Sequence, residues 1–321
     1  MSTMTDLQSH LAAYDAGAWQ RAVSKLAAEI HPIDREATLI WFTFYPLELH
    51  VTLAETADKE ATARQLGLMG TWQLADQIDS SHRFFYAHRY WPQVKLAVQN
   101  AEGPFAEDLA ELASAVATAA ARRARVDREF LLGISAAALM TYRQVGADAF
   151  TAAPGRIHLS EKARAMSPHQ VLKKRARDDS QGLFGFARGP HKHWTVTFDE
   201  SDPDATFTAI NGQEIATAAQ TDKREYKSRE PRCTPGEGPI PVECRAASCG
   251  TCWVGVLGGA EKLSPVVDRD ERRRMAVFGY TDSTEERPLI RLACQARAFG
   301  AVSIVIPPWN GLIGSCRASR R

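Results

Sequence analysis

Three cysteines stand close together in the stretch CRAASCGTCW, at Cys244, Cys249 and Cys252, and a fourth, Cys294, follows in RLACQA. Several thiolates that share one loop are ligands for zinc or for an iron–sulfur cluster. A loop that wraps a metal group must adopt one backbone path. These four residues therefore constrain the fold of the C-terminal region more than any other feature of the chain.

The spacing of the cysteines separates these two kinds of metal site. Structural zinc sites usually combine two short C-x2-C pairs. Here three cysteines form C-x4-C-x2-C and the fourth is distant, which is the plant-type [2Fe–2S] pattern. The residues between them let the backbone approach a cluster and point N–H groups at its sulfur atoms; we assign Arg245, Ala246, Ala247, Ser248, Gly250 and Thr251 to this cofactor-binding loop. No catalytic residue is assigned.

The C-terminal region resembles a known family. Residues 191–310 are similar to the [2Fe–2S] ferredoxin domain of plant and adrenodoxin type, through CRAASCGTC, VGVLGGAEKLSP, RLACQA and the closing VSIVIPP. The resemblance implies a β-grasp fold, a [2Fe–2S] cluster and one-electron transfer without substrate chemistry at the cluster. It also implies the ligands, which are Cys244 and Cys249, and Cys252 and Cys294.

This chain departs from the family pattern in three ways. The last ligand lies farther from the third, so we expect DRDERRRMAVFGYTDSTEERP to form an extra helix and loop. A polar insertion, residues 221–238, precedes the first ligand. The region from His191 to the end is nearly neutral rather than acidic, which puts the family's usual docking to a basic reductase in doubt.

Other residues near the motif have less certain roles. Cys233 and Cys316 fall outside the motif, and we take both as bystander thiols; the alternative is a redox-active pair or a substitute ligand. Cys249 and Cys252 also form C-x-x-C, but the βαβ context of a thioredoxin-like redox site is missing. Arg245 and Arg291, near the ligands, either add positive charge that tunes the cluster or are solvated rim residues.

The periodicity of hydrophobic residues predicts two domains of different class. Residues 1–150 read as an all-α domain, with helices in residues 7–30, 104–124 and 127–145. Pro104 is expected in the first turn of the second helix and Asp127 at the cap of the third. From His191 the period becomes two in HWTVTFDE, and ATFTAI, CWVGVL and AVSIVIPP are further strands, with a helix at EIATAAQ. We therefore expect an α+β domain at 191–310.

The two domains are joined by a basic segment rich in Gly and Pro, residues 151–190, and residues 311–321 form a basic tail. The run SPHQVLKKRARDD is a short basic helix, which we read as a solvated helix or linker; docking of an acidic partner is the alternative. In the helical domain, His82 and His88 are six residues apart, which does not place two side chains on one helix face. We expect no haem or metal site there.

Composition and absent motifs limit the function. The net charge is +1, which indicates neither nucleic acid nor an anionic membrane as a partner. No apolar run reaches the length of a membrane span, and the start MSTMTDLQSH has no secretory pattern, so we expect a cytoplasmic protein. No G-x-G-x-x-G or P-loop is found, so we expect no flavin or NAD site.

These observations lead to one interpretation and leave two others open. We expect an electron carrier that connects a reductase to an acceptor, with a helical domain that docks a partner or mediates self-association as a homo-oligomer. Plant-type ligation implies a potential around −400 mV. The first alternative is an oxidoreductase component with an active site in the helical domain. The second is a redox sensor.

Overall fold

The computed structural model describes residues 2–175, 192–266, 269–280 and 285–310. The expected tail at 311–321, which contains Cys316, and residues 176–191, which include the last part of the basic segment, lie outside the described residues. The chain divides into two compact units, the first made of residues 1–55 and 73–168 and the second of residues 56–72 and 169–321. Residues 56–72, which come from within the N-terminal half, thus belong with the C-terminal unit.

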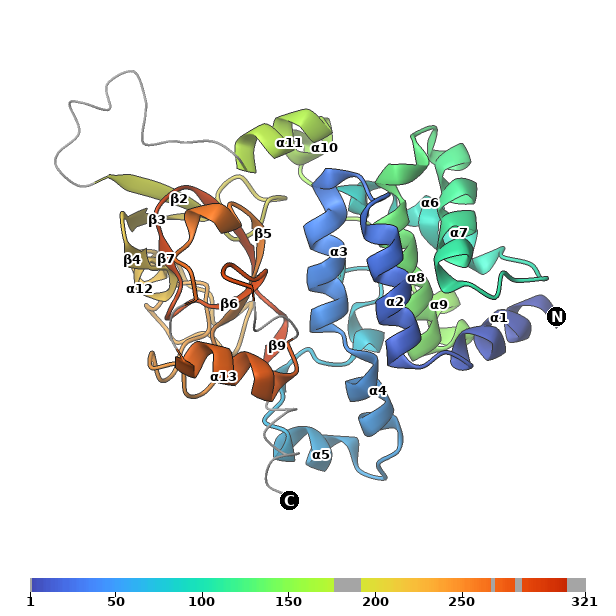
Figure 1. Ribbon diagram of the computed structural model, residues 1–321, viewed down its shortest axis with the longest axis horizontal. Helices are drawn as coiled ribbons and strands as arrows, with labels where there is room; N and C mark the ends of the chain where they lie inside the picture. Colours follow the sequence, from blue (N-terminus) through green and yellow to red (C-terminus); the bar gives the residue numbers. More distant parts are fainter. Residues whose placement is uncertain (1, 176–191, 267–268, 281–284, 311–321) are drawn as a thin grey trace. The chain divides into compact units, whose positions relative to one another are not determined.

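The first unit is helical, as the sequence predicts (Figure 1). Its α-helices are α1 (Ser2–Ala12), α2 (Ala16–Ala27), α3 (Pro32–Phe44), α4 (Leu47–Ala54), α6 (Trp91–Gln99), α7 (Leu109–Ala124), α8 (Leu132–Val145), α9 (Ala147–Ala152) and α10 (Glu161–Ala165). Short 3-10 turns are η1 (Leu74–Gln77), η2 (Tyr86–Tyr90) and η3 (Arg128–Phe130). Helix α8 is buried from Leu132 to Tyr142 and contacts α1, α2, α3, α6, α7 and α9, so it forms the core of this unit.

Two expected helix starts are wrong. Helix α7 begins at Leu109 rather than near Pro104, because the carboxylate of Asp108 accepts the Ala110 N–H at 2.7 Å and caps the helix there. Asp127 precedes η3 and makes no side-chain cap, and α8 begins after that turn. In both cases a residue that is typical of helix starts, Pro104 or Asp127, lies several residues before the first residue of the helix.

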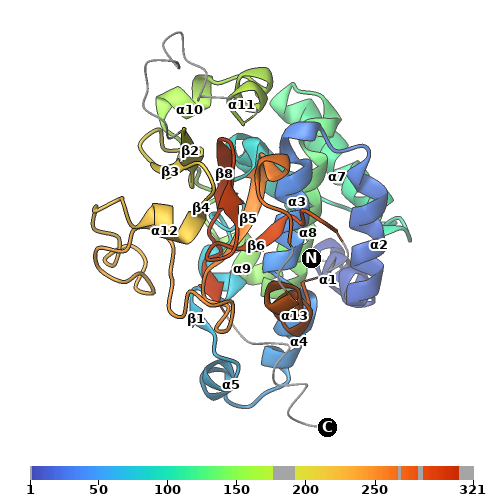
Figure 2. The same ribbon diagram turned by 60° about the vertical axis from the view of Figure 1, so that its left-hand side comes forward.

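The second unit contains a mixed sheet (Figure 2). Its elements are α5 (Lys59–Gln65), β1 (Met69–Gly70), α11 (Pro168–Arg175), β2 (His193–Thr197), β3 (Thr206–Ile210), β4 (Gln213–Glu214), α12 (Ile215–Ala219), β5 (Trp253–Gly258), η5 (Ala260–Lys262), α13 (Arg269–Phe278), β6 (Ile290–Leu292), β7 (Arg297–Ala298), β8 (Val302–Val305) and β9 (Trp309–Asn310). The predicted strands at β2, β3, β5 and β8, and the predicted helices α12 and α13, are all confirmed.

The five-stranded sheet has the order β3-β2-β8-β5-β6. Strands β2 and β8 are parallel, and the other neighbours are antiparallel. The register pairs Val196 with Val302 and Gly255 with Val305, so β2 begins beyond one end of β8 and β5 begins beyond the other. The cysteine loop, which leads into β5, therefore lies at the end of the sheet opposite the start of β2.

Residues 56–72, from the N-terminal half of the chain, contribute one strand of a two-stranded sheet in this unit. Strand β1 pairs with β9, with Gly70 opposite Trp309, and Thr71 donates its N–H to the Pro308 carbonyl at 2.9 Å. A Cβ on Gly70 would lie 2.4 Å from that carbonyl oxygen, so the close approach of the two strands requires glycine. No sequence pattern signalled this pairing, because two-residue strands have no periodicity.

The basic helix α11 is anchored to the second unit. Its last residue, Arg175, is buried and forms a bidentate ion pair with Glu200, at 2.7 and 2.8 Å. The Ser303 hydroxyl donates to the same carboxylate at 2.7 Å, which ties the pair to β8. Part of the basic run is thus a structural contact, whereas Lys173 and Lys174 are exposed, as expected for a solvated helix.

Candidate metal centre

The four predicted ligands meet at one end of the sheet. Cys244, Cys249 and Cys252 lie on the loop that leads into β5, and Cys294 follows β6. Strands β5 and β6 are antiparallel, and the Ala293 N–H donates to the Cys252 carbonyl at 2.9 Å. The distant cysteine is therefore brought to the loop by the register of this strand pair.

The four thiols interact as two pairs. Burial raises the pKa of Cys244, but hydrogen bonds from Ser248, Ala246 and Cys249 outweigh burial and lower that pKa to about 6. A hydrogen bond with Cys252 lowers the pKa of Cys294 to about 7, and the same bond together with burial raises the pKa of Cys252. Hydrogen bonding thus lowers the pKa of two of the four thiols, which shifts them toward the thiolate, the form that binds metal.

The pairs also affect each other electrostatically. A charge on Cys244 raises the pKa of Cys294, and a charge on Cys249 raises the pKa of Cys252. Each thiol of one pair therefore lies within electrostatic reach of a thiol of the other pair. Positively charged irons between them would remove this repulsion.

The backbone of the loop is folded around the first sulfur. The N–H groups of Ala246, Ser248 and Cys249 donate to Cys244 Sγ at 3.4, 3.3 and 3.3 Å. Arg245 and Ala247 adopt left-handed conformations, with φ of 54° and 55°, which non-glycine residues rarely do. Such conformations turn successive N–H groups toward one point and form an anion-binding concavity. The two strained residues, Arg245 and Ala247, thus lie where three backbone N–H groups donate to Cys244 Sγ.

The remaining loop residues are placed around the other thiols. The hydroxyl of Thr251, which is buried, lies 3.1 Å from Cys249 Sγ, and the Gln295 side-chain amide donates to Cys294 Sγ at 3.4 Å. Gln295 was not among the predicted residues. Gly250 has φ of 74°, and a Cβ there would lie 2.3 Å from the Phe278 ring, so the loop needs glycine at this position.

The two arginines near the ligands have different surroundings. Arg245 is half-buried and donates to Glu237 at 3.0 Å, so its charge is partly balanced. Arg291 is only 1% exposed and forms a bidentate pair with Glu271, which is also 1% exposed, at 2.9 and 3.1 Å. The alternative that Arg291 is a solvated rim residue is therefore wrong, and its charge is neutralised within the fold.

Glu271 was missed by the sequence analysis. Besides Arg291, it accepts the Leu292 N–H at 2.9 Å, so this carboxylate fixes α13 to β6 just before Cys294. Glu271, Met275 and Phe278 are the buried residues of α13, at spacings of four and three. That spacing could have indicated that Glu271 lies on the buried face of the helix. A glutamate in an arginine-rich helix normally faces solvent, however, so the signal is weak.

Aromatic side chains pack behind the loop. Trp253, next to Cys252, makes edge contacts with Phe278 and Tyr280 at centroid distances of 5.4 and 4.9 Å. All three residues are buried. Arg274 of α13 also donates to the Ala247 carbonyl at 3.2 Å. The extra helix predicted from the long interval before Cys294 thus supports the loop from one side.

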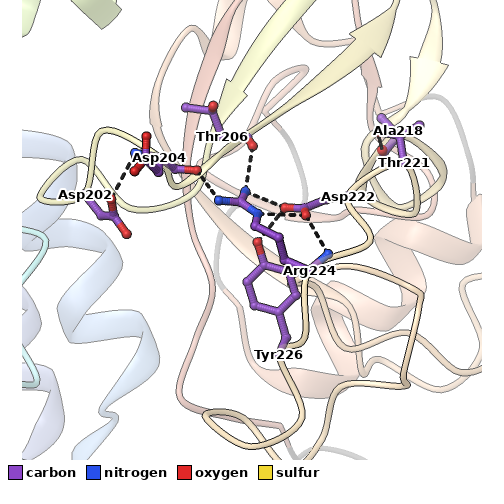
Figure 3. A network of polar contacts seen from close by, with 8 residues as sticks. All are labelled: Asp202, Asp204, Thr206, Ala218, Thr221, Asp222, Arg224 and Tyr226. Carbon is purple, nitrogen blue, oxygen red and sulfur yellow. Dashed lines mark hydrogen bonds and ion pairs between the residues drawn. The ribbon is translucent and has the colours of Figure 1, made fainter.

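The polar insertion before the first cysteine is held by Arg224 (Figure 3). Arg224 donates to the carbonyls of Asp204 and Thr206 at 2.6 and 3.0 Å, and its guanidinium is paired with Asp222. Asp222 also accepts the Tyr226 hydroxyl, at 2.5 Å. Because Thr206 begins the edge strand β3, these contacts attach the insertion to the sheet and cover part of its edge.

The cysteine that precedes the motif is a buried thiol. Cys233 donates to the Pro239 carbonyl at 3.4 Å, and burial raises its pKa to about 11. It is therefore protonated at neutral pH, unlike a reactive or metal-binding cysteine. All five described cysteines are free thiols. Within the described ranges, no group of three or more His, Cys, Asp and Glu residues converges on the position of a single metal ion; a [2Fe–2S] cluster instead needs two cysteines at each of its two irons.

The histidine interpretation requires a correction. His82 and His88 do not share a helix: a turn carries His82 and η2 carries His88, so helical spacing does not apply. Their Nδ1 atoms lie 3.0 Å apart, and both residues are buried. The imidazole of His82 also packs on Trp91, at a centroid distance of 3.9 Å. Tertiary folding brings together two histidines that the spacing appeared to separate.

The family comparison agrees with this geometry. Residues 233–299 match the model of the 2Fe-2S iron-sulfur cluster binding domain, and this range includes all four predicted ligands. These residues form a 2Fe-2S iron-sulfur cluster binding domain. The cofactor is a [2Fe–2S] cluster. No curated protein and no solved structure matches the chain. Among the described helices, none is both long and apolar enough to cross a membrane.

The residues present fit this cofactor. The four cysteines would supply the four ligands that a [2Fe–2S] cluster needs, and backbone N–H groups already point at a sulfur atom. The loop between the ligands contains small residues and glycine, which allow close approach of the backbone. The fit therefore rests on the chemistry of the donor set as well as on the sequence match.

Proposed function

We propose that this protein is a one-electron carrier in which Cys244 and Cys249 hold one iron and Cys252 and Cys294 hold the other. The observation that carries the proposal is the position of the four cysteines at one end of the sheet, three on the loop that leads into β5 and one just after its partner strand β6. A bound [2Fe–2S] cluster would accept one electron and later release it. The chain binds the cluster, keeps its ligands in place and directs donors toward its sulfur atoms.

The cysteine loop favours electron transfer over a purely structural role. N–H groups directed at a thiolate stabilise added negative charge, so they favour the reduced state of the cluster. Ala246 and Ser248 are exposed, which places part of the loop at the surface where a redox partner can approach. The partners are a reductase and an acceptor, and the potential lies around −400 mV.

The proposal also covers the fold class of the cluster domain, the role of the helical unit and the cellular compartment. We assign the mixed sheet to the β-grasp class, on the evidence of its mixed strand order and the family match. The N-terminal helices dock a redox partner or mediate self-association. The protein acts in the cytoplasm, where cysteines remain reduced.

The test is spectroscopic and uses anaerobically purified full-length protein. Absorption and EPR spectra are recorded before and after addition of dithionite, with assays of iron and sulfide. We expect about two irons and two sulfides per chain, bleaching on reduction and a rhombic EPR signal from the reduced cluster. Zinc without sulfide, persisting after reconstitution with iron and sulfide, would contradict the proposal.

A further inference from the structure

The indole N–H of Trp253 is an unsatisfied polar group beside the cysteine loop. Trp253 follows Cys252 directly and is 1% exposed. Its Nε1 atom is buried and has no hydrogen-bond partner within the part of the chain that the structure describes. Leaving a buried donor without an acceptor is costly; Trp19 and Trp309 also have such an N–H, but that of Trp253 lies beside the cysteine loop, where a bound cofactor offers an acceptor.

The position of this nitrogen relative to the loop is defined by Gly250. A Cβ built on Gly250 would lie 3.1 Å from Trp253 Nε1. Gly250 stands between Cys249 and Cys252, so the indole nitrogen lies beside the part of the loop that connects these two predicted ligands. The absence of a side chain at this position leaves room for the indole.

The orientation of the indole is fixed by packing. Phe278 and Tyr280 contact it edge-on, at interplanar angles of 65° and 87°, and both rings are buried. A ring held on two sides cannot turn its N–H toward solvent without disturbing α13. The donor is therefore pre-organised next to the loop, which is the condition under which a hydrogen bond contributes most to a site.

We propose that Trp253 Nε1–H donates a hydrogen bond to a sulfur atom on the Cys249–Cys252 side of the bound cluster and thereby raises its reduction potential. This inference rests on the proposed function. Reduction adds one electron and one negative charge to the cluster, while the indole keeps its proton. A donor at sulfur stabilises the more negative state more strongly, so the reduced form is favoured.

The first experiment measures the hydrogen bond without a mutation. Full-length protein is prepared with tryptophan labelled with 15N at the indole nitrogen, and the reduced cluster is studied by pulsed EPR in H2O and in D2O. We expect a 15N coupling and an exchangeable-proton coupling assigned to an indole. A normal cluster signal without an indole 15N coupling would overturn the inference and leave the electron-carrier proposal intact. An absent cluster would instead contradict that proposal.

The second experiment uses Trp253→Phe, which keeps an aromatic ring and removes the N–H. We expect the potential to fall, with the redox equilibrium constant changing about three- to tenfold; tenfold corresponds to about 59 mV for one electron. The indole couplings should vanish together with this shift. A Trp253→Phe protein with an unchanged potential and unchanged exchangeable-proton couplings would contradict the inference.

Two control variants separate the hydrogen bond from general packing effects. Trp194→Phe makes the same change at the opposite end of β8, where the indole N–H donates to Asn211 at 3.0 Å, and should leave the potential unchanged. Phe278→Leu loosens the packing around Trp253 but keeps its N–H, so the indole coupling should persist. If Phe278→Leu lowered the potential as much as Trp253→Phe while keeping the coupling, packing rather than the hydrogen bond would set the potential.

Discussion

The cysteine loop (residues 244–252) and the histidine turn (residues 82–88) both bring polar groups together. The two regions differ in where these groups find their hydrogen-bond partners. In the turn, Asp34 accepts the N–H groups of Tyr86 and Ala87 at 2.7 and 2.8 Å, and the two imidazoles contact each other. In the loop, three N–H groups point at one thiol and the indole N–H of Trp253 has no described partner. Apart from His82 Nε2, which is buried without a described partner, the turn makes these polar contacts within its own unit, whereas the loop directs several donors toward the position of a cofactor.

The largest predicted effect tests the loop directly. Cys294→Ser should abolish stable binding of the [2Fe–2S] cluster, because one iron loses one of its thiolates. Iron and sulfide assays and the visible spectrum of the purified variant measure this loss. Cys233→Ser is the matched control: Cys233 lies in the same unit but bonds to the Pro239 carbonyl, and the variant should keep both irons. Equal loss of iron in the two variants would contradict the ligand assignment.

The second prediction concerns the support of the loop. Glu271→Gln leaves the Arg291 guanidinium buried without a charged partner, so the second unit should lose about 3–5 kcal/mol of stability. Urea unfolding followed through the cluster absorbance measures the change. A double variant, Glu271→Leu with Arg291→Met, removes both charges and should recover much of the loss, since apolar replacements of a buried pair are often neutral. A Glu271→Gln protein as stable as the wild type would show that this pair does not support the fold.

The third prediction tests the histidine turn by pH. Burial lowers the pKa of His82 well below 6.5, and the neighbouring His88 lowers it further. The unfolded chain therefore binds a proton below about pH 6.5 that the folded unit excludes, so stability falls as the pH falls below that value. The expected slope is about 1.4 kcal/mol per pH unit for this one group.

Chemical unfolding of the helical unit between pH 7.5 and 5 measures this slope. His82→Gln should reduce it by the contribution of one proton. A helical unit with the same stability at both ends of this range would show that His82 is not held neutral by the fold.

The smallest predicted effect concerns the insertion before the first cysteine. Arg224→Ala removes donors from the Asp204 and Thr206 carbonyls and from Asp222, and should cost about 1–2 kcal/mol. The cluster content should stay at two irons, because none of these contacts involves a cysteine. Urea unfolding and iron assays on the same preparation test both statements. A loss of iron would show that the insertion also shapes the cysteine loop.

Much of the metal centre was predictable from the sequence. The spacing of Cys244, Cys249, Cys252 and Cys294 marked them as candidate ligands, and the structure brings all four to one end of the sheet; strands β2, β3, β5 and β8 follow from local periodicity. The interval before Cys294 also indicated an extra helix, which is α13. Apart from the distant Cys294, these features are encoded over short stretches, where neighbouring residues determine the pattern.

Tertiary structure alone decided the remaining features. The sequence did not show that Glu271 pairs with Arg291, that β1 joins β9, or that His82 meets His88. Each of these contacts joins residues on different elements, and its energy depends on burial that only the completed fold provides. The sequence by itself determined the four candidate ligands of the cluster, whereas the packing of β6, α13 and Trp253 decided which charges and donors surround them.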